Sequence, residues 1–316
     1  MAHLLTTLAN ASVLLCVPAF FINFFVATVS ANGRLIKETY KFFMLNIALV
    51  EMIFSLSWLT FQFYVVITDS SLACTISAYC GVFLGGTVSV AVCIVSFDRY
   101  MNLFHPVLHS LYFTKLLCCL ICILSYLPFS LLSLPILFFR FHTTPVLCSM
   151  TVAPATDFHI TLTTLLAAPV AGFFQTCTVF FVYQIRLKLK EREQLATVLK
   201  EKQKIKRNRE LMQGITLQFV SSAVLLLPAP MCTLFYVVVR GEVSPLLGWL
   251  LTALYFINPI IDPLFSIFIM KPYNKAAATF VQFLRRGHCK IESAEPTSTN
   301  APTVSKKNRV TPFNHK

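Results

Sequence analysis

Seven long stretches that are almost free of charged residues dominate this sequence. Each is long enough to cross the roughly 30 Å hydrocarbon core of a membrane, which takes about 20 helical residues. A backbone in lipid has to satisfy its own hydrogen bonds, and these runs are too uniformly apolar for barrel strands, so the sequence predicts helices. The stretches are Ala11–Ala31, Phe42–Thr68, Ser70–Phe97, Leu116–Phe139, His159–Ile185, Leu211–Val239 and Val243–Met270. We therefore expect an all-α membrane protein, a seven-transmembrane helix bundle.

The charged residues support the same fold. Only 12% of the residues are charged, about half the share of a typical soluble domain. If the N-terminus lies outside the cell, 24 of the 26 Lys and Arg residues fall on the cytoplasmic side, and only Arg140 and Arg240 lie outside. This distribution predicts an extracellular N-terminus and a cytoplasmic C-terminus at the plasma membrane. Because topology explains the net charge of +13, no nucleic-acid partner is expected.

Four parts follow from this topology: a short extracellular N-terminus (1–10), the seven-transmembrane domain (11–270), a membrane-surface helix (271–286) and a disordered cytoplasmic tail (287–316). The first span could instead be a cleaved signal peptide, but no basic residue precedes it and the apolar run is too long. Asn10 begins an Asn-Ala-Ser sequon and is a glycosylation candidate. Its closeness to the membrane could also leave it unmodified.

An amphipathic helix is predicted after the last span, because Tyr273, Phe280 and Leu284 recur at helical spacing beside basic residues. We expect it to lie on the inner leaflet of the bilayer. Cys289 follows closely and is a palmitoylation candidate. The remaining tail is rich in Ser, Thr and Pro, which is typical of disorder.

Two cysteines fall where a disulfide is permitted. Cys74 lies 25 residues before Arg99, at the outer end of the same predicted helix, and Cys148 lies in the next outside loop. Both would face an oxidising compartment. The alternative is that they are small buried hydrophobic residues, but their positions favour the bridge.

Short motifs follow one another along the spans. They are Asn23-Phe24-Phe25-Val26, Ile47-Ala48-Leu49-Val50-Glu51, Asp98-Arg99-Tyr100, Pro135, Pro169 and Asn258-Pro259-Ile260-Ile261-Asp262. In their kind and order these motifs resemble those of the class A (rhodopsin-like) G-protein-coupled receptors, over about residues 18–284. The chain departs from the family where Glu51 replaces Asp, Asp262 replaces Tyr, and Leu226 replaces the tryptophan of the sixth span.

The resemblance implies a heterotrimeric G protein as the partner, and an arrestin that recognises a phosphorylated tail. It implies that Asp98, Arg99 and Tyr100 form the coupling motif, with Arg99 paired to Asp98 at rest and free to contact the G protein on activation. It also implies that an intramembrane polar network forms from Asn23, Glu51, Asn258, Pro259 and Asp262. Two adjacent carboxyl groups would then share a proton or a cation. Alternatively, Glu51 is simply hydrogen-bonded and Asp262 faces the cytoplasm.

The sequence says less about the ligand than about the coupling motif. Amine receptors of this family carry an Asp 18 residues before the arginine, where this chain has Gly81. Candidate pocket residues in the outer halves of the spans are Gln62, Tyr79, Gly81, His159, Thr163, Tyr236 and Tyr255. This set suits a small, largely apolar ligand. Several aromatic residues of these outer halves, such as Trp58, could instead belong to an aromatic belt at the membrane surface.

Other functions remain as alternatives. An odorant-type or other chemosensory receptor would belong to the same class. A proton- or cation-coupled transporter could use the two buried acids, although no internal repeat is present. All seven His residues lie at ends, loops or tails, so no metal site, no cofactor and no membrane enzyme is expected.

Overall fold

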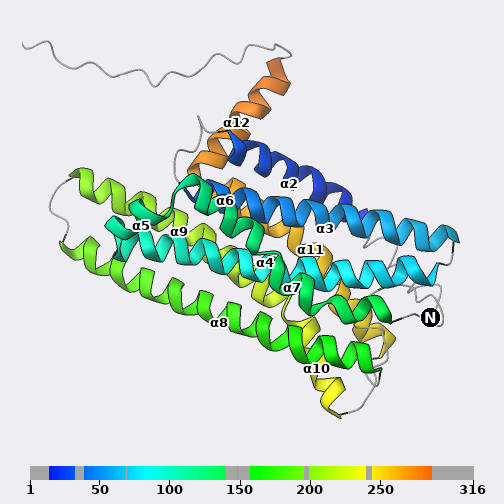
Figure 1. Cartoon of the computed structure of the whole chain (residues 1–316). Helices are drawn as coiled ribbons and strands as arrows, with labels where there is room; N and C mark the ends of the chain where they lie inside the picture. The colour runs from blue at the N-terminus through cyan, green and yellow to red at the C-terminus, as the bar shows by residue number, and fades with distance from the viewer. Residues whose placement is uncertain are drawn as a thin grey trace, which may run out of the picture. The chain divides into compact units, whose positions relative to one another are not determined.

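The computed structural model describes residues 14–32, 39–68, 70–139, 148, 157–195, 199–239 and 244–286, and no strand occurs among them (Figure 1). The predicted modification sites at Asn10 and Cys289 lie outside these residues, as does the tail from 287 onward. The chain divides into two compact units, Met1–Ala278 and Thr279–Lys316. The helix bundle and the sites described below belong to the first unit.

Helices account for nearly all of the described chain. Their bounds are α2 Cys16–Ala31, α3 Tyr40–Thr68, α4 Ser71–Phe104, α5 Pro106–Tyr112, α6 Lys115–Leu124, α7 Leu127–Leu132, the 3-10 helix η1 Leu134–Phe138, α8 Phe158–Leu195, α9 Leu199–Leu225, α10 Pro228–Val239, α11 Pro245–Ile269 and α12 Lys271–Arg286. Among the described residues, six segments are long and apolar enough to cross a membrane, and α2 is a shorter apolar helix of 16 residues. These seven segments match the seven predicted stretches, so the all-α bundle is confirmed.

Side-chain caps fix where several helices begin. The Ser70 hydroxyl accepts a hydrogen bond from the backbone N–H of Ala73 at the start of α4, and Ser244 caps α11 in the same way. At the start of α8, the Asp157 carboxylate accepts from the N–H groups of His159 and Ile160. Such caps satisfy backbone donors that the first helical turn leaves unpaired.

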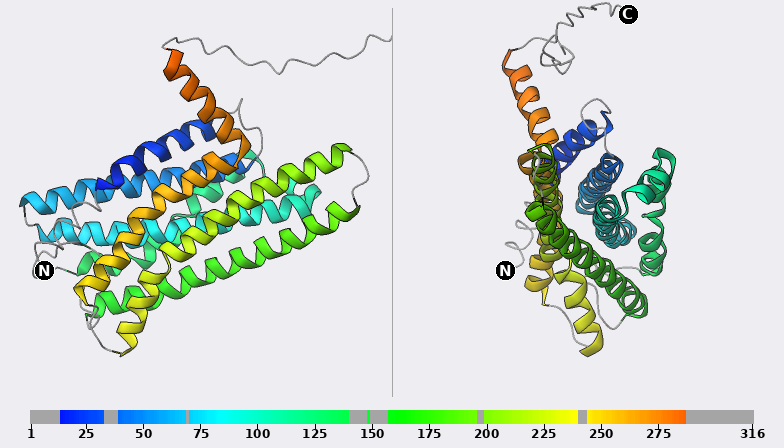
Figure 2. Two further views of the ribbon diagram at one scale, coloured as in Figure 1. Left: turned by 180° about the vertical axis from the view of Figure 1, so that it is seen from behind. Right: turned by 90° about the vertical axis from the view of Figure 1, so that its left-hand side faces the viewer.

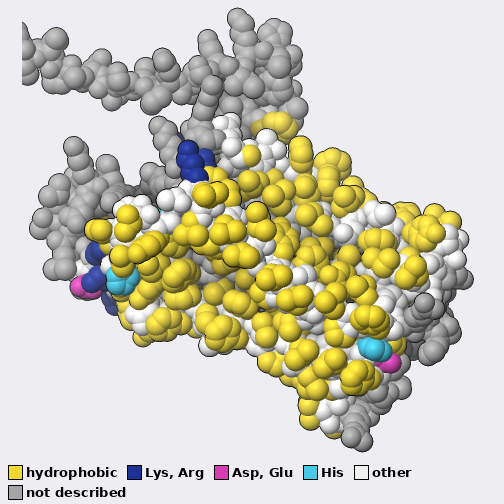
Figure 3. Space-filling view, viewed as in Figure 1, with side chains coloured by type: hydrophobic (Ala, Val, Ile, Leu, Met, Phe, Trp, Pro, Cys, Tyr) yellow, Lys and Arg dark blue, Asp and Glu magenta, His cyan; other side chains and the backbone are white. Residues whose placement is uncertain are grey.

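Neighbouring helices pack side by side, with α2 against α3, α3 against α4, α4 against α8 and α9 against α11 (Figure 2). Their shared core holds large aromatic side chains such as Tyr40, Phe43 and Phe256, each no more than 2% exposed. Figure 3 shows hydrophobic side chains covering most of one face of the bundle, while the visible Lys and Arg side chains lie toward the end that holds α5. An apolar exterior of this kind suits a bilayer.

Two spans depart from straight helices. The fourth, predicted as one helix over 116–139, is broken into α6, α7 and η1, because Pro128 and Pro135 lack the N–H that would continue the helix. The sixth span is interrupted before Pro228, where proline lacks the N–H that would continue the helix, and becomes α9 and α10. By contrast, Pro169 lies inside α8 without ending it.

Candidate functional site

The Asp98–Arg99 pair is buried at the end of α4 that leads into α5. The Arg99 Nε donates to Asp98 Oδ2 over 2.8 Å, and the exposed fractions are 0% for Asp98 and 7% for Arg99. On the other side, the Tyr40 ring centroid lies 4.8 Å from the guanidinium carbon of Arg99. Cation–π contacts of this kind add to the attraction when both groups are desolvated. The arginine is therefore held between a carboxylate and an aromatic face.

The same carboxylate accepts hydrogen bonds from two further residues, one on either side of α4 in the sequence. The Thr39 hydroxyl, next to the start of α3, donates to Asp98 Oδ1 over 3.2 Å, and His109 Nε2 in α5 lies 2.9 Å from the same oxygen. His109 is buried and stacks on Phe113 at 4.6 Å between ring centroids. Around it, the apolar side chains of Val107, Leu108 and Leu111 are exposed. Helix α5 thus connects the buried pair to the surface.

A small cavity of about 20 Å³ lies beside Arg99. Its lining residues come from α4, α8 and α9: Arg99, Asn102, Leu103, Ile185, Leu189, Asn208 and Met212. Except for Arg99 these side chains are uncharged. If the cavity widened, it would expose the guanidinium to a partner on that side.

A second buried cluster joins α2, α3, α9 and α11 in the middle of the bundle. The Asn258 amide Nδ2 lies 3.3 Å from Glu51 Oε1 and 3.3 Å from Asp262 Oδ2, so one amide bridges the two carboxyl groups. Asn23 Nδ2 donates to the backbone carbonyl of Pro259 over 2.7 Å. All four side chains are no more than 1% exposed.

Asp262 has two further donors from α9. The Ser222 hydroxyl lies 3.2 Å from Asp262 Oδ2, and the Ser221 hydroxyl donates to Oδ1. The carboxylate is thus buried and directed at α9, which differs from the alternative that it faces the cytoplasm. The structure therefore brings together the five residues of the predicted network.

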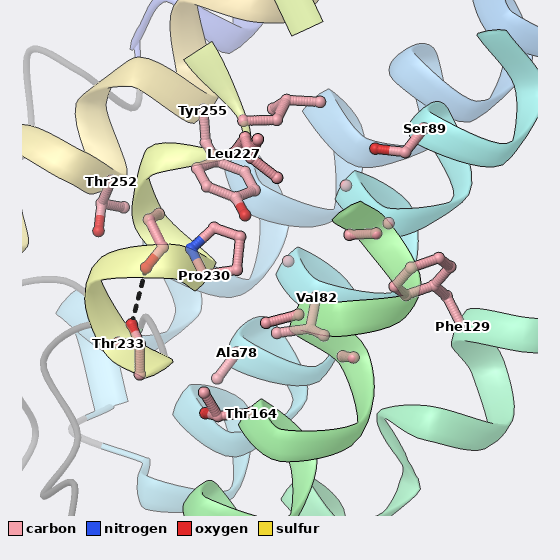
Figure 4. A pocket seen from close by; sticks show the side chains of 18 of the residues that line it. Ala78, Val82, Ser89, Phe129, Thr164, Leu227, Pro230, Thr233, Thr252 and Tyr255 are labelled. Atoms are coloured by element: carbon pink, nitrogen blue, oxygen red, sulfur yellow. Dashed lines mark hydrogen bonds between the residues drawn. The ribbon is translucent and has the colours of Figure 1, made fainter. Parts of the chain in front are cut away.

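The half of the bundle that the sequence predicts to lie toward the outside contains a cavity of about 60 Å³, here called the outer cavity (Figure 4). Its walls come mainly from α4, α8, α10 and α11, and its lining residues are Trp58, Ala78, Gly81, Val82, Gly85, Gly86, Ser89, Phe129, Thr164, Ala167, Ala168, Ala171, Leu226, Leu227, Ala229, Pro230, Thr233, Thr252 and Tyr255. None of these residues is charged. Two buried polar atoms of the lining, Trp58 Nε1 and Thr164 Oγ1, have no hydrogen-bond partner among the described residues.

Glycines on α4 bring aromatic rings against its backbone at this cavity. A Cβ on Gly81 would lie 3.2 Å from Trp58, and one on Gly85 would lie 2.7 Å from the ring of Tyr255. A Cβ on Gly86 would overlap Phe129. The lack of a side chain at these three glycines therefore allows α3, α7 and α11 to approach α4 closely.

Cys74, in the first turn of α4, forms a disulfide with Cys148, as predicted. Next to it, the Thr75 hydroxyl donates to the backbone carbonyl of Phe139 over 2.9 Å. The chain on either side of Cys148 lies outside the described residues. The bridge ties this part of the chain to the same helix that carries Asp98 and Arg99.

The sequence matches the family model of the seven-transmembrane receptors of the rhodopsin family over residues 22–265. The chain belongs to the rhodopsin family. This stretch runs from α2 to α11 and includes the buried pair, the polar cluster and the outer cavity. The chain is therefore a seven-transmembrane receptor, and members of its family generally couple to G proteins. No curated protein was found to match the receptor.

Of the predicted pocket residues, Gly81 and Tyr255 line the outer cavity and the other five do not. Gln62 instead donates to Ser77 Oγ over 3.4 Å, and Tyr79 stacks on Phe83. His159 lies against Phe138. Thr163 is fully buried on α8, and Tyr236 lies next to Phe235 on α10.

Sequence reasoning missed several contributors to the receptor's sites. Trp58 had been a candidate for the membrane surface, but it is buried and lines the cavity. Thr39, Tyr40 and His109 surround the Asp98–Arg99 pair without belonging to any recognised motif. His109 carried one usable signal, since it is a polar residue on the short helix that follows His105-Pro106.

Proposed function

We propose that the receptor converts the binding of a small extracellular ligand into activation of a heterotrimeric G protein, and that Arg99 is the residue that contacts the G protein. The observation that carries the proposal is the buried Asp98–Arg99 pair beside a cavity at one end of the bundle. The distribution of Lys and Arg along the sequence favours the cytoplasm for that end. We propose a plasma-membrane location and no enzymatic activity, in keeping with a receptor family.

The contacts of Asp98 support a resting state in which Arg99 stays paired with it. Asp98 accepts hydrogen bonds from Arg99, Thr39 and His109, which together compensate a buried carboxylate. A G protein would have to bind the arrangement in which Arg99 is released more tightly than the one in which it is paired. That difference in affinity is what shifts the population toward the active state.

Replacing Asp98 by asparagine tests this arrangement. Asp98→Asn removes the charge that holds Arg99 while keeping the side-chain size, so we expect ligand-free G-protein activation to rise at least threefold. The measurement is G-protein dissociation in cells across all Gα families, at matched surface expression. Glu193→Gln is the control, because Glu193 forms only an exposed ion pair with Arg209. Equal activity in wild type and Asp98→Asn would contradict the resting role of the pair.

The outer cavity supports a neutral, largely apolar ligand. Its lining has no charge to pair with an ammonium or a carboxylate, and burying an unpaired charge is unfavourable. The free donor at Trp58 and the hydroxyl of Thr164 could satisfy one or two polar atoms of a ligand. A screen of uncharged lipophilic compounds, odorant-like molecules included, is therefore the first choice. We also propose that an arrestin binds the phosphorylated tail, as it does in the family that the sequence resembles.

We also propose that Glu51 and Asp262 share one proton or bind one cation. Both carboxyl groups lie within 3.3 Å of the same nitrogen of Asn258, so they are too close to carry two uncompensated charges. We expect ligand-free activity to change when either sodium or pH is titrated, and Glu51→Gln to remove that response. The measurement uses purified receptor and G protein. No response of the wild type to either titration would exclude the shared site.

Transport is the second candidate function, supported by the same pair of buried acids. Proton-dependent currents that persist after G-protein inactivation would favour transport over signalling.

A further inference from the structure

Two buried polar side chains in the wall of the outer cavity have no hydrogen-bond partner among the described residues. They are Trp58 of α3, which is 2% exposed, and Thr164 of α8, which is 1% exposed. The unpartnered atoms are Trp58 Nε1 and Thr164 Oγ1. Burying a polar group without a partner is costly, and natural proteins hold few such groups. Two of them in the wall of one cavity indicate a ligand that supplies the missing partners.

Thr164 differs from the other threonines of the same wall. Thr233 and Thr252 each donate to the backbone carbonyl four residues earlier in their own helix, over 2.9 and 2.8 Å. Figure 4 marks the bond of Thr233 with a dashed line. The hydroxyl of Thr164 makes no such bond with a described residue, although it lies on a helix in the same way. Among these three threonines, it is therefore the hydroxyl that is left for a ligand.

Aromatic rings fix the position of the Trp58 indole. Its ring lies 5.0 Å from that of Phe256 and 6.1 Å from that of Phe54, measured between ring centroids. On the side of α4, a Cβ on Gly81 would lie 3.2 Å from Trp58 Cζ2 and 3.6 Å from Trp58 Nε1. Gly81 and Trp58 both line the cavity. The missing side chain at Gly81 thus leaves the N–H of Trp58 uncovered on that side.

This environment selects the kind of atom that binds beside Trp58. An indole N–H only donates, so its partner has to be an acceptor. A carbonyl oxygen accepts without bringing a hydrogen of its own. The hydrogen of an alcohol would need an acceptor next to the rings of Phe54 and Phe256, which contain no oxygen or nitrogen. A charged acceptor is disfavoured because none of the described lining residues carries a countercharge.

The volume of the cavity restricts the ligand to a small molecule. A dry protein cavity of about 150 Å³ holds benzene, a molecule of six carbon atoms. The outer cavity has a volume of about 60 Å³, so it accepts about six non-hydrogen atoms or fewer. Gly85 and Gly86 do not enlarge it, because the rings of Tyr255 and Phe129 occupy the space that their side chains would take.

We infer that the outer cavity binds a small neutral carbonyl compound, a ketone or an ester, whose carbonyl oxygen accepts a hydrogen bond from Trp58 Nε1. In an ester, the second oxygen accepts from the hydroxyl of Thr164. That such a molecule is also the signal to which the receptor responds rests on the proposed function. Binding itself needs no G protein and is measured without one.

Fluorescence of the purified receptor measures the binding. The chain has two tryptophans, so Trp58 is the sole source of indole emission in the Trp249→Phe variant. Trp249 does not line the cavity and its Nε1 has no partner among the described residues, so this substitution removes no hydrogen bond seen there. We expect butanone to change the emission with saturation.

The control ligand is the hydrocarbon isostere of butanone, in which a methylene group replaces the oxygen. We expect it to compete with butanone about tenfold more weakly, because it leaves the N–H of Trp58 unpaired. The corresponding secondary alcohol and primary amine should also bind more weakly than the ketone. Equal affinity of butanone and its isostere, or no saturable change with butanone, would overturn the inference.

Two pairs of variants locate the contacts, with the rise in Tm on adding ligand as the readout. Trp58→Phe keeps a ring and removes the N–H, so the rise with butanone should disappear, whereas Trp249→Phe should keep it. Thr164→Val should weaken ethyl acetate about tenfold and leave butanone unchanged. Thr163→Val should change neither, because Thr163 is buried with an equally unpartnered hydroxyl but does not line the cavity. Equal behaviour within either pair would overturn the assigned contacts.

Chain length tests the size limit. Each added methylene increases the tendency of a ketone to leave water, so a larger site would bind longer ketones more tightly. We expect affinity to fall from butanone to nonanone in the same competition measurement. A steady rise in affinity with chain length would contradict the limit.

These measurements separate the inference from the proposed coupling. A receptor that binds butanone without activating any G protein would contradict the proposed function and leave the assigned ligand class intact. A receptor that activates a G protein in the Asp98→Asn variant, but binds butanone no better than its isostere, would overturn the ligand class alone.

Discussion

Replacing Arg99 by alanine is expected to abolish G-protein activation, in the wild type and in the Asp98→Asn variant, without lowering the amount of receptor at the cell surface. Activation should disappear because the guanidinium is the charged group beside the small cavity between α4, α8 and α9. Folding should survive because Asp98 keeps Thr39 and His109 as hydrogen-bond donors, so the buried carboxylate is not left uncompensated.

The measurement is G-protein dissociation across all Gα families, with surface receptor counted in the same cells. Arg209→Ala is the matched control, since Arg209 is 61% exposed and pairs only weakly with Glu193. An Arg99→Ala receptor that signals as strongly as its parent would remove the arginine from the mechanism. A receptor that fails to reach the surface would show that Arg99 is needed for folding, contrary to the partners assigned to Asp98.

Adding a single methyl group at Gly86 is expected to have the largest effect on stability. A Cβ there would overlap the ring of Phe129, including its Cγ atom, and Phe129 is 1% exposed. Overpacking of a core typically costs about 1–3 kcal/mol, and backbone-to-ring overlap places Gly86→Ala at the upper end of that range. We expect a drop in Tm of about 2–4 °C per kcal/mol and a marked loss of surface receptor.

Gly172→Ala provides the matched control for this prediction. The same methyl group on α8 would meet only the terminal carbon of Met231 at 3.7 Å, an ordinary contact. We expect its Tm to stay within about 1 °C of the wild type, because alanine is the better helix former. Combining Gly86→Ala with Phe129→Leu should recover part of the lost stability. A Gly86→Ala receptor as stable as Gly172→Ala would show that α7 is not packed on α4 as described.

Much of the fold could be predicted because the length of an apolar stretch and the distribution of charged residues are properties of whole segments and do not depend on how individual side chains pack. Seven apolar stretches, each long enough to cross a bilayer, defined the bundle. The break of the fourth span was missed because Pro128 and Pro135 were not weighed together. The number of prolines does not decide the outcome: Pro169 lies inside α8, and Pro259 and Pro263 lie inside α11, without dividing either helix, whereas the spans that hold Pro128 with Pro135 and Pro228 with Pro230 are divided.

The sites were predictable only where partners are close in sequence or belong to one motif. Asp98 and Arg99 are neighbours, and Asn258 and Asp262 are one helical turn apart. Partners on other helices, such as Thr39 and Ser222, depend on how helices rotate against each other, which composition does not determine. Trp58 illustrates this limit, since only its face of α3 distinguishes a cavity wall from a membrane-surface belt.

The hydrogen bond between His109 of helix α5 and Asp98 couples the position of α5 to the Asp98–Arg99 pair. Val107, Leu108 and Leu111 are 76%, 45% and 65% exposed, while His109 on the same short helix is buried against the carboxylate. A protein that covers those three side chains and shifts α5 also changes the strength with which Asp98 holds Arg99. Linkage makes this effect reciprocal: release of Arg99 must tighten the binding of that protein by the same factor by which the protein favours release.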